Sequence, residues 1–252
     1  MQLAELSWPA VHALSKHTPI IFPIAALEQH GGHLPVFTDS LLLGEIVRRS
    51  AERLGDGVLW APLMWLGNSD HHLDFAGTLS AAPRAYLDLL NGLVENFIQH
   101  GFKRLVFING HGGNDVPGKQ AVFELRQRHR SRNDLLLVFA TYWLLGGEPW
   151  KRDASIQQRE MGHACEWETS MILRIRPELV GDVAKLETVE FGHGFAPASR
   201  GWITKDRSAP GHIGSPQLAT REKGEVIFAT FTDDVVNLLE RVIRWDGKSW
   251  NG

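Results

Sequence analysis

The sequence concentrates metal-ligating side chains in one short stretch, EQHGGHLPVFTD, at residues 28–39. Glu28 and His30 are two positions apart, so their side chains point the same way if the stretch is extended. Asp39, at the end of the stretch, could give one carboxylate oxygen to each of two ions. Zinc and manganese both accept imidazole and carboxylate ligands. The pattern therefore indicates a centre of two divalent ions, which can share a bridging water or hydroxide.

A second stretch, NGHGGN at residues 109–114, offers a further imidazole, that of His111. Its glycines permit unusual backbone angles and let the backbone approach a ligand closely. We expect Gly112, Gly113 and Asn114 to lie at the substrate. A glycine loop between a strand and a helix also suits a bound phosphate, and that alternative stays open.

A third stretch, HACEWETSMILRI at residues 163–175, could complete the metal site. If it is helical, His163 and Glu166 lie on one face at positions i and i+3, and Glu168 points well away from Glu166. We therefore expect Glu166 to ligate a metal ion and to form the catalytic pair with His163. Glu168 would then orient an imidazole or a backbone turn. The choice between Glu166 and Glu168 stays open.

Each of these residues also has an ordinary structural interpretation. Glu28 could pair with an arginine, and Asp39 could be the N-cap of the helix that follows it. Four histidines outside these stretches are assigned to the surface or the core: His12, His17, His100 and His129. The metal interpretation is preferred because three separate stretches supply ligand-type side chains.

The elements that position these stretches alternate between strands and helices. Short apolar runs bounded by polar residues or prolines predict strands at residues 18–27, 58–65, 103–108 and 135–143. Apolar residues at helical spacing predict helices at residues 38–55, 83–97, 120–130, 163–175 and 217–245. Residues 185–218 are rich in glycine, proline and serine, which indicates long loops.

This alternation predicts an α/β fold with three α/β/α layers and a largely parallel central sheet, in a single domain over residues 1–252. In such sheets ligands bind beyond the carboxyl ends of the strands. The stretches at 28–39 and 109–114 both begin where a predicted strand ends. Their side chains are therefore expected to converge.

Composition argues against several classes of partner. The net charge of -3, without a basic block, gives no electrostatic footprint for nucleic acid, and no apolar run approaches the roughly 20 residues that cross a bilayer. The single cysteine, Cys165, cannot form an internal disulfide, and the first residues lack the pattern of a signal peptide. We expect a cytoplasmic protein that acts on a small molecule.

In these motifs the sequence resembles the creatininase family of metal-dependent creatinine amidohydrolases. The matching motifs run in family order from about residue 20 to residue 228: EQHGGHLP with Asp39 behind it, GNSDHHLDFAGTLS, NGHGGN, HACEWETS and GHIGSPQLATREKGE. The resemblance implies one α/β domain, two divalent metal ions per chain and hydrolysis of a non-peptide C–N bond. It also implies a homo-oligomer, commonly a hexamer.

Carried over by position, the resemblance assigns five metal ligands. One ion is held by Glu28 and His111, the other by His30 and Glu166, and Asp39 bridges the two. The ions are expected to be zinc, manganese or both, and iron is an alternative. Within GNSDHHLDFAGTLS, Ser69 and His72 match a family position near the substrate.

The chain also departs from creatininases proper. Those enzymes have a glutamate where this chain has Gly113, so the resemblance is to the NGHGGN branch of the family, in which Glu166 replaces the missing carboxylate. That branch includes deformylases and peptide-processing enzymes. Cys165 stands where the family usually has glycine, and we interpret it as a small buried thiol.

The expected activity is hydrolysis of a cyclic amide or formamide by a metal-bridging hydroxide, because metal ions lower the pKa of bound water from 15.7 toward about 7. His163 would pass a proton to the departing nitrogen. The alternatives are creatinine hydrolysis itself, a peptide-processing or deformylase activity, and a catalytically inactive metal- or ligand-binding module. A hydrolase with Cys165 as nucleophile is a further alternative.

Overall fold

Four parallel strands form the centre of the protein. The computed structural model describes residues 1–192 and 195–250. The strands are β1 (Ile20–Ile24), β2 (Leu59–Trp60), β3 (Arg104–Asn109) and β4 (Leu136–Thr141). They lie in the order β2-β1-β3-β4, and each pairing among these strands is parallel.

Helices connect the strands and continue after the last one. The longer helices are α2 (Thr38–Leu54), α3 (Pro83–Gln99), α4 (Asp115–Arg128), α6 (Glu166–Ile175) and α8 (Arg221–Arg244). The short ones are α1 (Trp8–Ala13), α5 (Pro149–Arg152) and α7 (Thr204–Arg207). Short 3-10 turns are found at Leu3–Glu5, Gly55–Gly57, Asp70–His72, Gly112–Asn114, Tyr142–Leu144, Pro177–Leu179 and Pro216–Leu218.

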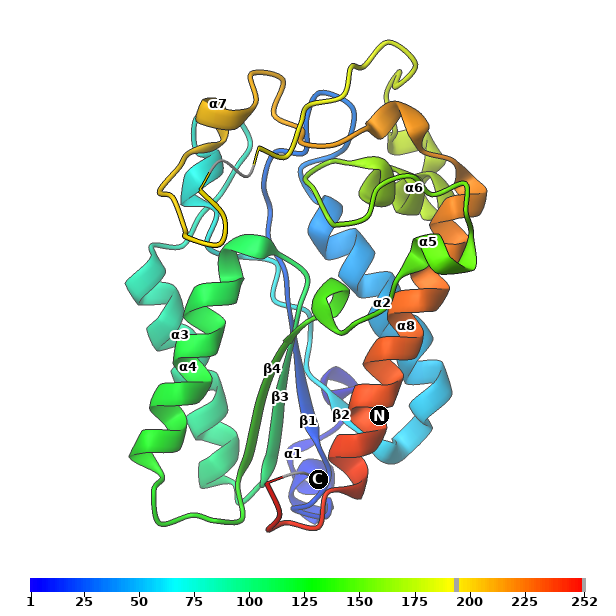
Figure 1. The fold of residues 1–252 in the computed structure, drawn as a ribbon. Helices are drawn as coiled ribbons and strands as arrows, with labels where there is room; N and C mark the ends of the chain where they lie inside the picture. The colour runs from blue at the N-terminus through cyan, green and yellow to red at the C-terminus, as the bar shows by residue number, and fades with distance from the viewer. Residues whose placement is uncertain (193–194, 251–252) are drawn as a thin grey trace.

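The helices cover both faces of the sheet, which confirms the predicted α/β/α layers. In Figure 1, α3 and α4 lie on one side of the strands and α2 and α8 on the other. Successive strand residues face opposite sides, so that Ile20 and Phe22 belong to the core beneath α3 and α4, and Ile21 to the core beneath α2 and α8. Strands β1, β2 and β3 are buried along their whole length and are mostly apolar, as expected where helices cover both faces of a sheet.

The edge strand β2 is shorter than the strand predicted at residues 58–65. It pairs with β1 only over Leu59–Trp60. Pro62 follows, and a proline interrupts a strand ladder because it has no amide hydrogen to donate. Met64 then contacts Ile24 as an isolated parallel bridge.

Helix α6 begins at Glu166 rather than at the predicted His163. Ala164 has a positive φ of 48°, which an α-helix does not allow. His163 instead pairs with Ile213 as an antiparallel bridge, and its amide lies 2.9 Å from the Ile213 carbonyl oxygen. His163 therefore lies on a loop that precedes the helix.

Helix α8 also begins later than predicted, at Arg221 rather than at Gln217. Thr220 is its N-cap, and its hydroxyl accepts a hydrogen bond from the Lys223 amide at 3.3 Å. A threonine in this position satisfies one of the amides that a helix start leaves unpaired.

The loops that follow β1, β2 and β3 gather at the carboxyl edge of the sheet. They comprise residues 25–37, 61–82 and 110–114 and lie above the strands in Figure 1. This is the edge at which open α/β sheets bind ligands. Within the described ranges, none of the helices has the length and apolar character needed to span a bilayer.

Candidate metal centre and active site

A buried cluster at this edge contains Glu28, His30, Asp39 and His111, each no more than 4% exposed. Its members come from the loop after β1, the first turn of α2 and the loop after β3. Asp39 lies between the two imidazoles: its Oδ1 is 3.1 Å from His30 Nε2, and its Oδ2 is 3.1 Å from His111 Nδ1. Glu28 Oε1 lies 3.3 Å from the same nitrogen of His111.

Hydrogen bonds on the outer side of each imidazole direct a lone pair into the cluster. His30 Nδ1 donates to the Glu28 carbonyl oxygen at 3.1 Å, which leaves Nε2 as the inward nitrogen. His111 Nε2 donates to the Asn68 carbonyl oxygen at 2.8 Å, which leaves Nδ1 as the inward nitrogen. In metal sites such outer hydrogen bonds fix the ring and its tautomer.

Four buried side-chain atoms in the cluster and beside it have no hydrogen-bond partner among the described residues. They are Glu28 Oε2, His30 Nε2, Asp39 Oδ2 and Glu168 Oε2, and all are buried. Burying unpaired carboxylate oxygens is costly unless a cation compensates them. The donor set, which consists of imidazole and carboxylate groups, therefore fits divalent metal ions such as zinc or manganese.

The electrostatics of the cluster also favour a cation. Burial by itself raises the pKa of Glu28, but His111 and His72 outweigh this effect and hold that pKa well below its ordinary value. Burial by itself lowers the pKa of His111, but Glu28 and Asp39 outweigh it and raise that pKa to about 10. Burial likewise opposes protonation of His30, whose pKa is nevertheless raised by its carboxylate neighbours. Without metal, the imidazoles thus hold protons where cations would bind.

Glu168 reaches this cluster and Glu166 does not. Glu168 Oε1 lies 3.6 Å from His30 Nε2, and Glu168, His30 and His163 have ligand atoms close enough together to hold an ion. Glu166 points elsewhere: its carboxylate lies 2.6 Å from Lys223 Nζ and accepts hydrogen bonds from backbone amides. The geometry therefore favours Glu168 over Glu166 as the candidate ligand from this segment. The choice of Glu166 from the sequence assumed a helix from residue 163, and the helix begins at Glu166 itself.

His163 lies beside the cluster in a different orientation from the expected helical one. Its Nε2 donates to the Gln29 carbonyl oxygen at 2.7 Å, and its Nδ1 lies 3.7 Å from Glu28 Oε1. The ring packs against those of His30 and His72, each with centroids 4.3 Å away. Burial and the charges of these two histidines lower the pKa of His163 well below its ordinary value, so the ring is neutral.

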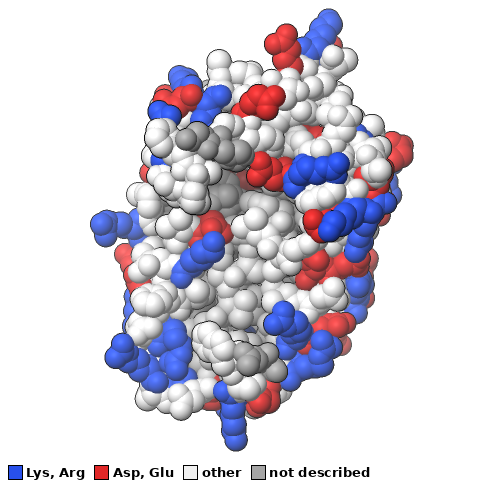
Figure 2. All heavy atoms as spheres, in the orientation of Figure 1, with Lys and Arg blue, Asp and Glu red and all other residues white. Residues whose placement is uncertain are grey.

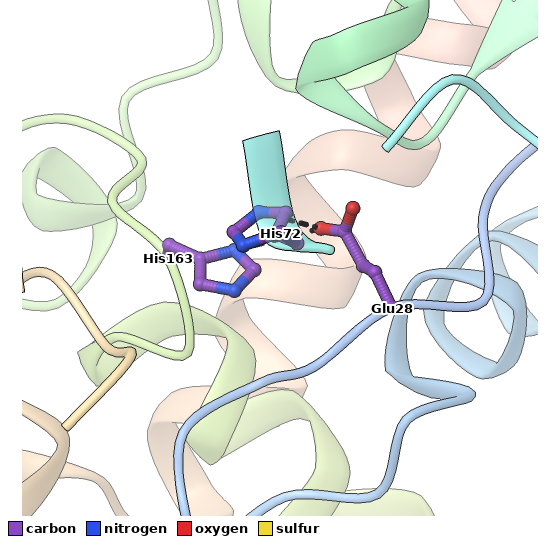
Figure 3. Close-up of side chains that lie close together, drawn as sticks. All are labelled: Glu28, His72 and His163. Atoms are coloured by element: carbon purple, nitrogen blue, oxygen red, sulfur yellow. Dashed lines mark ion pairs between the residues drawn. The ribbon is translucent and has the colours of Figure 1, made fainter. Parts of the chain in front are cut away.

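His72 is closer to the cluster than its sequence-based assignment to the substrate site indicated. Its Nε2 lies 3.3 Å from Glu28 Oε1, and Figure 3 shows its ring beside that of His163 and facing the Glu28 carboxylate. Its Nδ1 lies 2.7 Å from Thr204 Oγ1 and 2.8 Å from Gln29 Nε2. His72 is thus held by side chains from two distant segments.

Gln29 was missed by sequence reasoning. Its Nε2 donates to the Gly211 carbonyl oxygen at 2.9 Å, so the residue links His72 and His163 to the segment before the bridge at Ile213. It lies between Glu28 and His30 in the chain, where alternation would point its side chain away from them. The signal that could have found it is its position inside the EQH motif.

The glycine loop has two parts with different surroundings. Gly112 and Gly113 line a cavity above the cluster, as expected for a substrate site. Asn114 is fully buried, donates to the Ala25 carbonyl oxygen at 3.0 Å and accepts from the Asn68 amide at 2.9 Å. Asn114 therefore connects the loop after β1 to the loop after β2 and is not among the residues that line the cavity. Ser69 is also fully buried, and its hydroxyl lies 3.2 Å from His111 Nε2.

The cavity has a volume of about 640 Å³. Three members of the cluster, Glu28, Asp39 and His111, line it together with His163. Its walls are largely apolar or aromatic and include Val116, Trp143, Met161, Phe191 and Trp202. Arg200 and Arg207 also line it. Elsewhere, basic and acidic side chains are mixed over the face shown in Figure 2.

Comparison with known sequences places this arrangement in a family. Residues 4–239 match the profile of the creatininase family, described as creatinine amidohydrolase. The chain belongs to the creatininase family. It is 32% identical to the mycofactocin precursor peptide peptidase of Mycobacterium ulcerans over 264 residues, which cover 96% of this chain and 92% of the relative. It is 28% identical to the creatinine amidohydrolase of Pseudomonas putida, with 94% of this chain and 95% of the relative covered.

Solved structures agree with this membership. A crystal structure of creatinine amidohydrolase superimposes with a TM-score of 0.80 at 26% sequence identity, covering 97% of this chain and 98% of the other. A manganese form of creatininase gives the same TM-score and identity, covering 97% and 99%. The creatininase-like fold and the assignment to the amidohydrolases are therefore established by both comparisons.

Proposed function

We propose that the protein is an amidohydrolase with two divalent metal ions. The observation that carries the proposal is Asp39, whose two carboxylate oxygens each lie 3.1 Å from a different inward-facing imidazole nitrogen. A carboxylate in this position can serve two ions at once. Glu28, Asp39 and His111 would hold one ion, and His30, Asp39 and Glu168 the other. Bound ions supply an activated water molecule and polarise the amide carbonyl.

His163 is the residue proposed to move protons. Its neutral ring keeps a proton on Nε2 through the hydrogen bond to Gln29 and presents an unprotonated Nδ1 toward Glu28. That nitrogen can accept a proton and deliver it to the departing nitrogen, which is otherwise a poor leaving group. His72 lies against the same ring and is proposed to face the substrate.

A second candidate activity is hydrolysis of a peptide. Two observations favour it: the 32% identity to the mycofactocin precursor peptide peptidase, and a cavity of about 640 Å³ with aromatic walls. Pockets of this size accept ligands much larger than one small cyclic amide. The glycines of the NGHGGN loop, with Gly113 in place of a glutamate, are consistent with the branch of the family that includes peptide-processing enzymes.

The experiment that tests the proposal combines metal analysis with an activity panel. Protein purified without chelator is expected to contain about two ions per chain and to lose them in the His30→Ala/Asp39→Ala variant. Cyclic amides, formamides and short peptides are then assayed with the metal-loaded protein. Folded protein that binds no metal would contradict the proposal. Protein that binds two ions but hydrolyses none of these compounds would instead support a binding module without turnover.

Three further properties stay proposals. The ions are proposed to be zinc or manganese, with iron as an alternative, because the donor set accepts each of them. The oligomer is proposed to be a hexamer, and the location to be cytoplasmic. Elemental analysis and mass photometry of the purified protein test the first two.

A further inference from the structure

Glu166 and Lys223 form a buried ion pair outside the metal cluster. Lys223 Nζ lies 2.6 Å from Glu166 Oε1, and the two side chains are 8% and 0% exposed, the lysine being the more exposed. Removing two charges from water is costly unless their remaining hydrogen bonds are satisfied. Lys223 Nζ also donates to the Leu218 carbonyl oxygen at 2.7 Å. None of the roles proposed above uses this pair.

The Glu166 carboxylate holds the backbone that leads to His163. It accepts hydrogen bonds from the amide of Gln157 at 3.0 Å and from that of Gln158 at 2.7 Å. The Gln158 side chain also contacts Glu166. Its Oε1 accepts a hydrogen bond from the Glu166 amide at 2.9 Å. Residues 157–166 are therefore closed into a loop at their two ends.

A second segment packs against this loop. Gln158 Oε1 also accepts from the Ser215 amide at 2.8 Å. Gly162 lies so close to the Ile213 carbonyl oxygen that a Cβ there would collide with it. We call residues 157–166 and 213–218, together with Lys223, the His163 frame.

We propose that the Glu166–Lys223 pair is a positioning device that fixes the His163 imidazole over the metal cluster. This inference rests on the function proposed above. His163 lies on a loop, so the frame holds its backbone through Ile213, and the hydrogen bond from its Nε2 to the Gln29 carbonyl oxygen orients the ring, with Nδ1 3.7 Å from Glu28. A shift of about 1 Å at a group that transfers protons can cost on the order of a hundredfold in rate.

The pair is expected to act on His163 without releasing the metal ions. Glu28, His30 and Asp39 come from the loop after β1 and the start of α2, and His111 comes from the loop after β3. These segments lie outside the His163 frame. Glu168 lies in helix α6 itself, where helical hydrogen bonds and the packing against α8 hold it.

The test removes one charge at a time from the metal-loaded protein. Glu166→Gln keeps the shape of the side chain but leaves the Lys223 charge unpaired. It is expected to lower kcat for the amide identified by the panel by about ten- to a hundredfold, with KM within about threefold and two ions retained. Lys223→Met is expected to act in the same direction but less strongly, because Glu166 keeps its amide contacts. In both variants the amides of residues 157–163 should exchange hydrogen faster.

Glu225→Gln is the matched control. Glu225 lies on α8, as Lys223 does. It forms ion pairs with Arg49 at 2.8 Å and with Arg174 at 2.6 Å, and neither arginine belongs to the frame. This variant is expected to change kcat by less than about twofold, and exchange in residues 157–163 should not change, even if the melting temperature falls. If Glu166→Gln does not fold, Glu166→Gln/Lys223→Met removes both charges and should fold with kcat still reduced.

Two results would overturn the inference. One is a kcat in the pair variants that matches that of Glu225→Gln, and the other is hydrogen exchange in residues 157–163 that stays at the wild-type rate. The exchange measurement needs no substrate. If the proposed function is wrong, the wild-type protein will lack bound metal or turnover. If only the positioning role is wrong, the pair variants will show wild-type hydrogen exchange in residues 157–163.

Discussion

Glu166 and Glu168 leave the first turn of α6 on different sides. Glu168 Oε1 lies 3.6 Å from His30 Nε2 in the candidate metal cluster, whereas Glu166 Oε1 lies 2.6 Å from Lys223 Nζ. Residues two apart on an α-helix are separated by about 200° of rotation. One helix start therefore supplies a carboxylate to the cluster and another to the loop that carries His163.

The first prediction separates these two carboxylates by metal content. Glu168→Gln is expected to lower the bound metal from about two ions per chain toward one, because the amide cannot replace an anionic ligand beside His30. Glu166→Gln should keep both ions. Elemental analysis after dialysis against metal-free buffer measures the difference. Equal metal content in the two variants would contradict the assignment of Glu168.

The second prediction concerns the bridging carboxylate. Asp39→Asn is expected to reduce binding of both ions and to lower the rate at least about a hundredfold, since one of the two oxygens that face His30 and His111 becomes an amide nitrogen. Asp115→Asn is the control, because Asp115 also lies in the first turn of a helix but contacts Thr141 at 2.8 Å. If Asp39→Asn retained two tightly bound ions, the bridging role would be wrong.

The third prediction concerns His163. His163→Ala is expected to lower kcat by about 10²- to 10⁴-fold, the usual contribution of a positioned acid or base. Both ions should remain bound, because the proposed ligand sets do not include this residue. Kinetics and elemental analysis on the same preparation check both parts. Loss of one ion in His163→Ala would show that His163 is a ligand.

The fourth prediction is that metal binding releases protons. In the metal-free protein, Glu28 and Asp39 overcome the effect of burial and raise the pKa of His111 to about 10, so its imidazole is protonated at pH 7. An ion must displace that proton, so metal affinity should rise with pH between about 7 and 10. Calorimetry in buffers of different ionisation enthalpy should give a release of about one to two protons per chain. A binding enthalpy that does not depend on the buffer would exclude this linkage.

The same pKa increase has a consequence for the stability of the metal-free protein. Because the pKa of His111 is higher in the folded chain than its ordinary value of 6.5, protonation stabilises the fold fully below about pH 6.5. This contribution is lost as the pH rises through about 10. Thermal unfolding of metal-free protein should therefore show a melting temperature that falls between pH 7 and pH 10, and metal-loaded protein should not follow that trend.

The fifth prediction excludes Cys165 as a nucleophile. The side chain is fully buried, and burial raises the pKa of its thiol to about 11, so almost no thiolate forms at neutral pH. Cys165→Ala is expected to keep activity within about twofold, with a stability loss of about 1 kcal/mol. The native thiol should react with thiol reagents far more slowly than the unfolded one. Rapid alkylation with parallel loss of activity would contradict this prediction.

The sequence by itself determined the layers of the fold and the loops that carry the candidate site. Apolar runs such as residues 103–108 are typical of strands buried on both faces, and the helical periodicity behind them requires parallel connections. Parallel strands end at one edge of the sheet, so the positions of Glu28 and His111 directly after two such strands were enough to predict that they meet.

Only the tertiary structure decided the start of α6 and the direction of the side chains around it. His163 is held out of the helix by its pairing with Ile213, and Glu166 is turned toward Lys223, both of which lie far along the chain. Local spacing cannot reveal partners of this kind. The physical reason is that helical periodicity fixes the angle between neighbouring side chains, whereas the point at which a helix begins depends on which distant groups satisfy its first amides and charges.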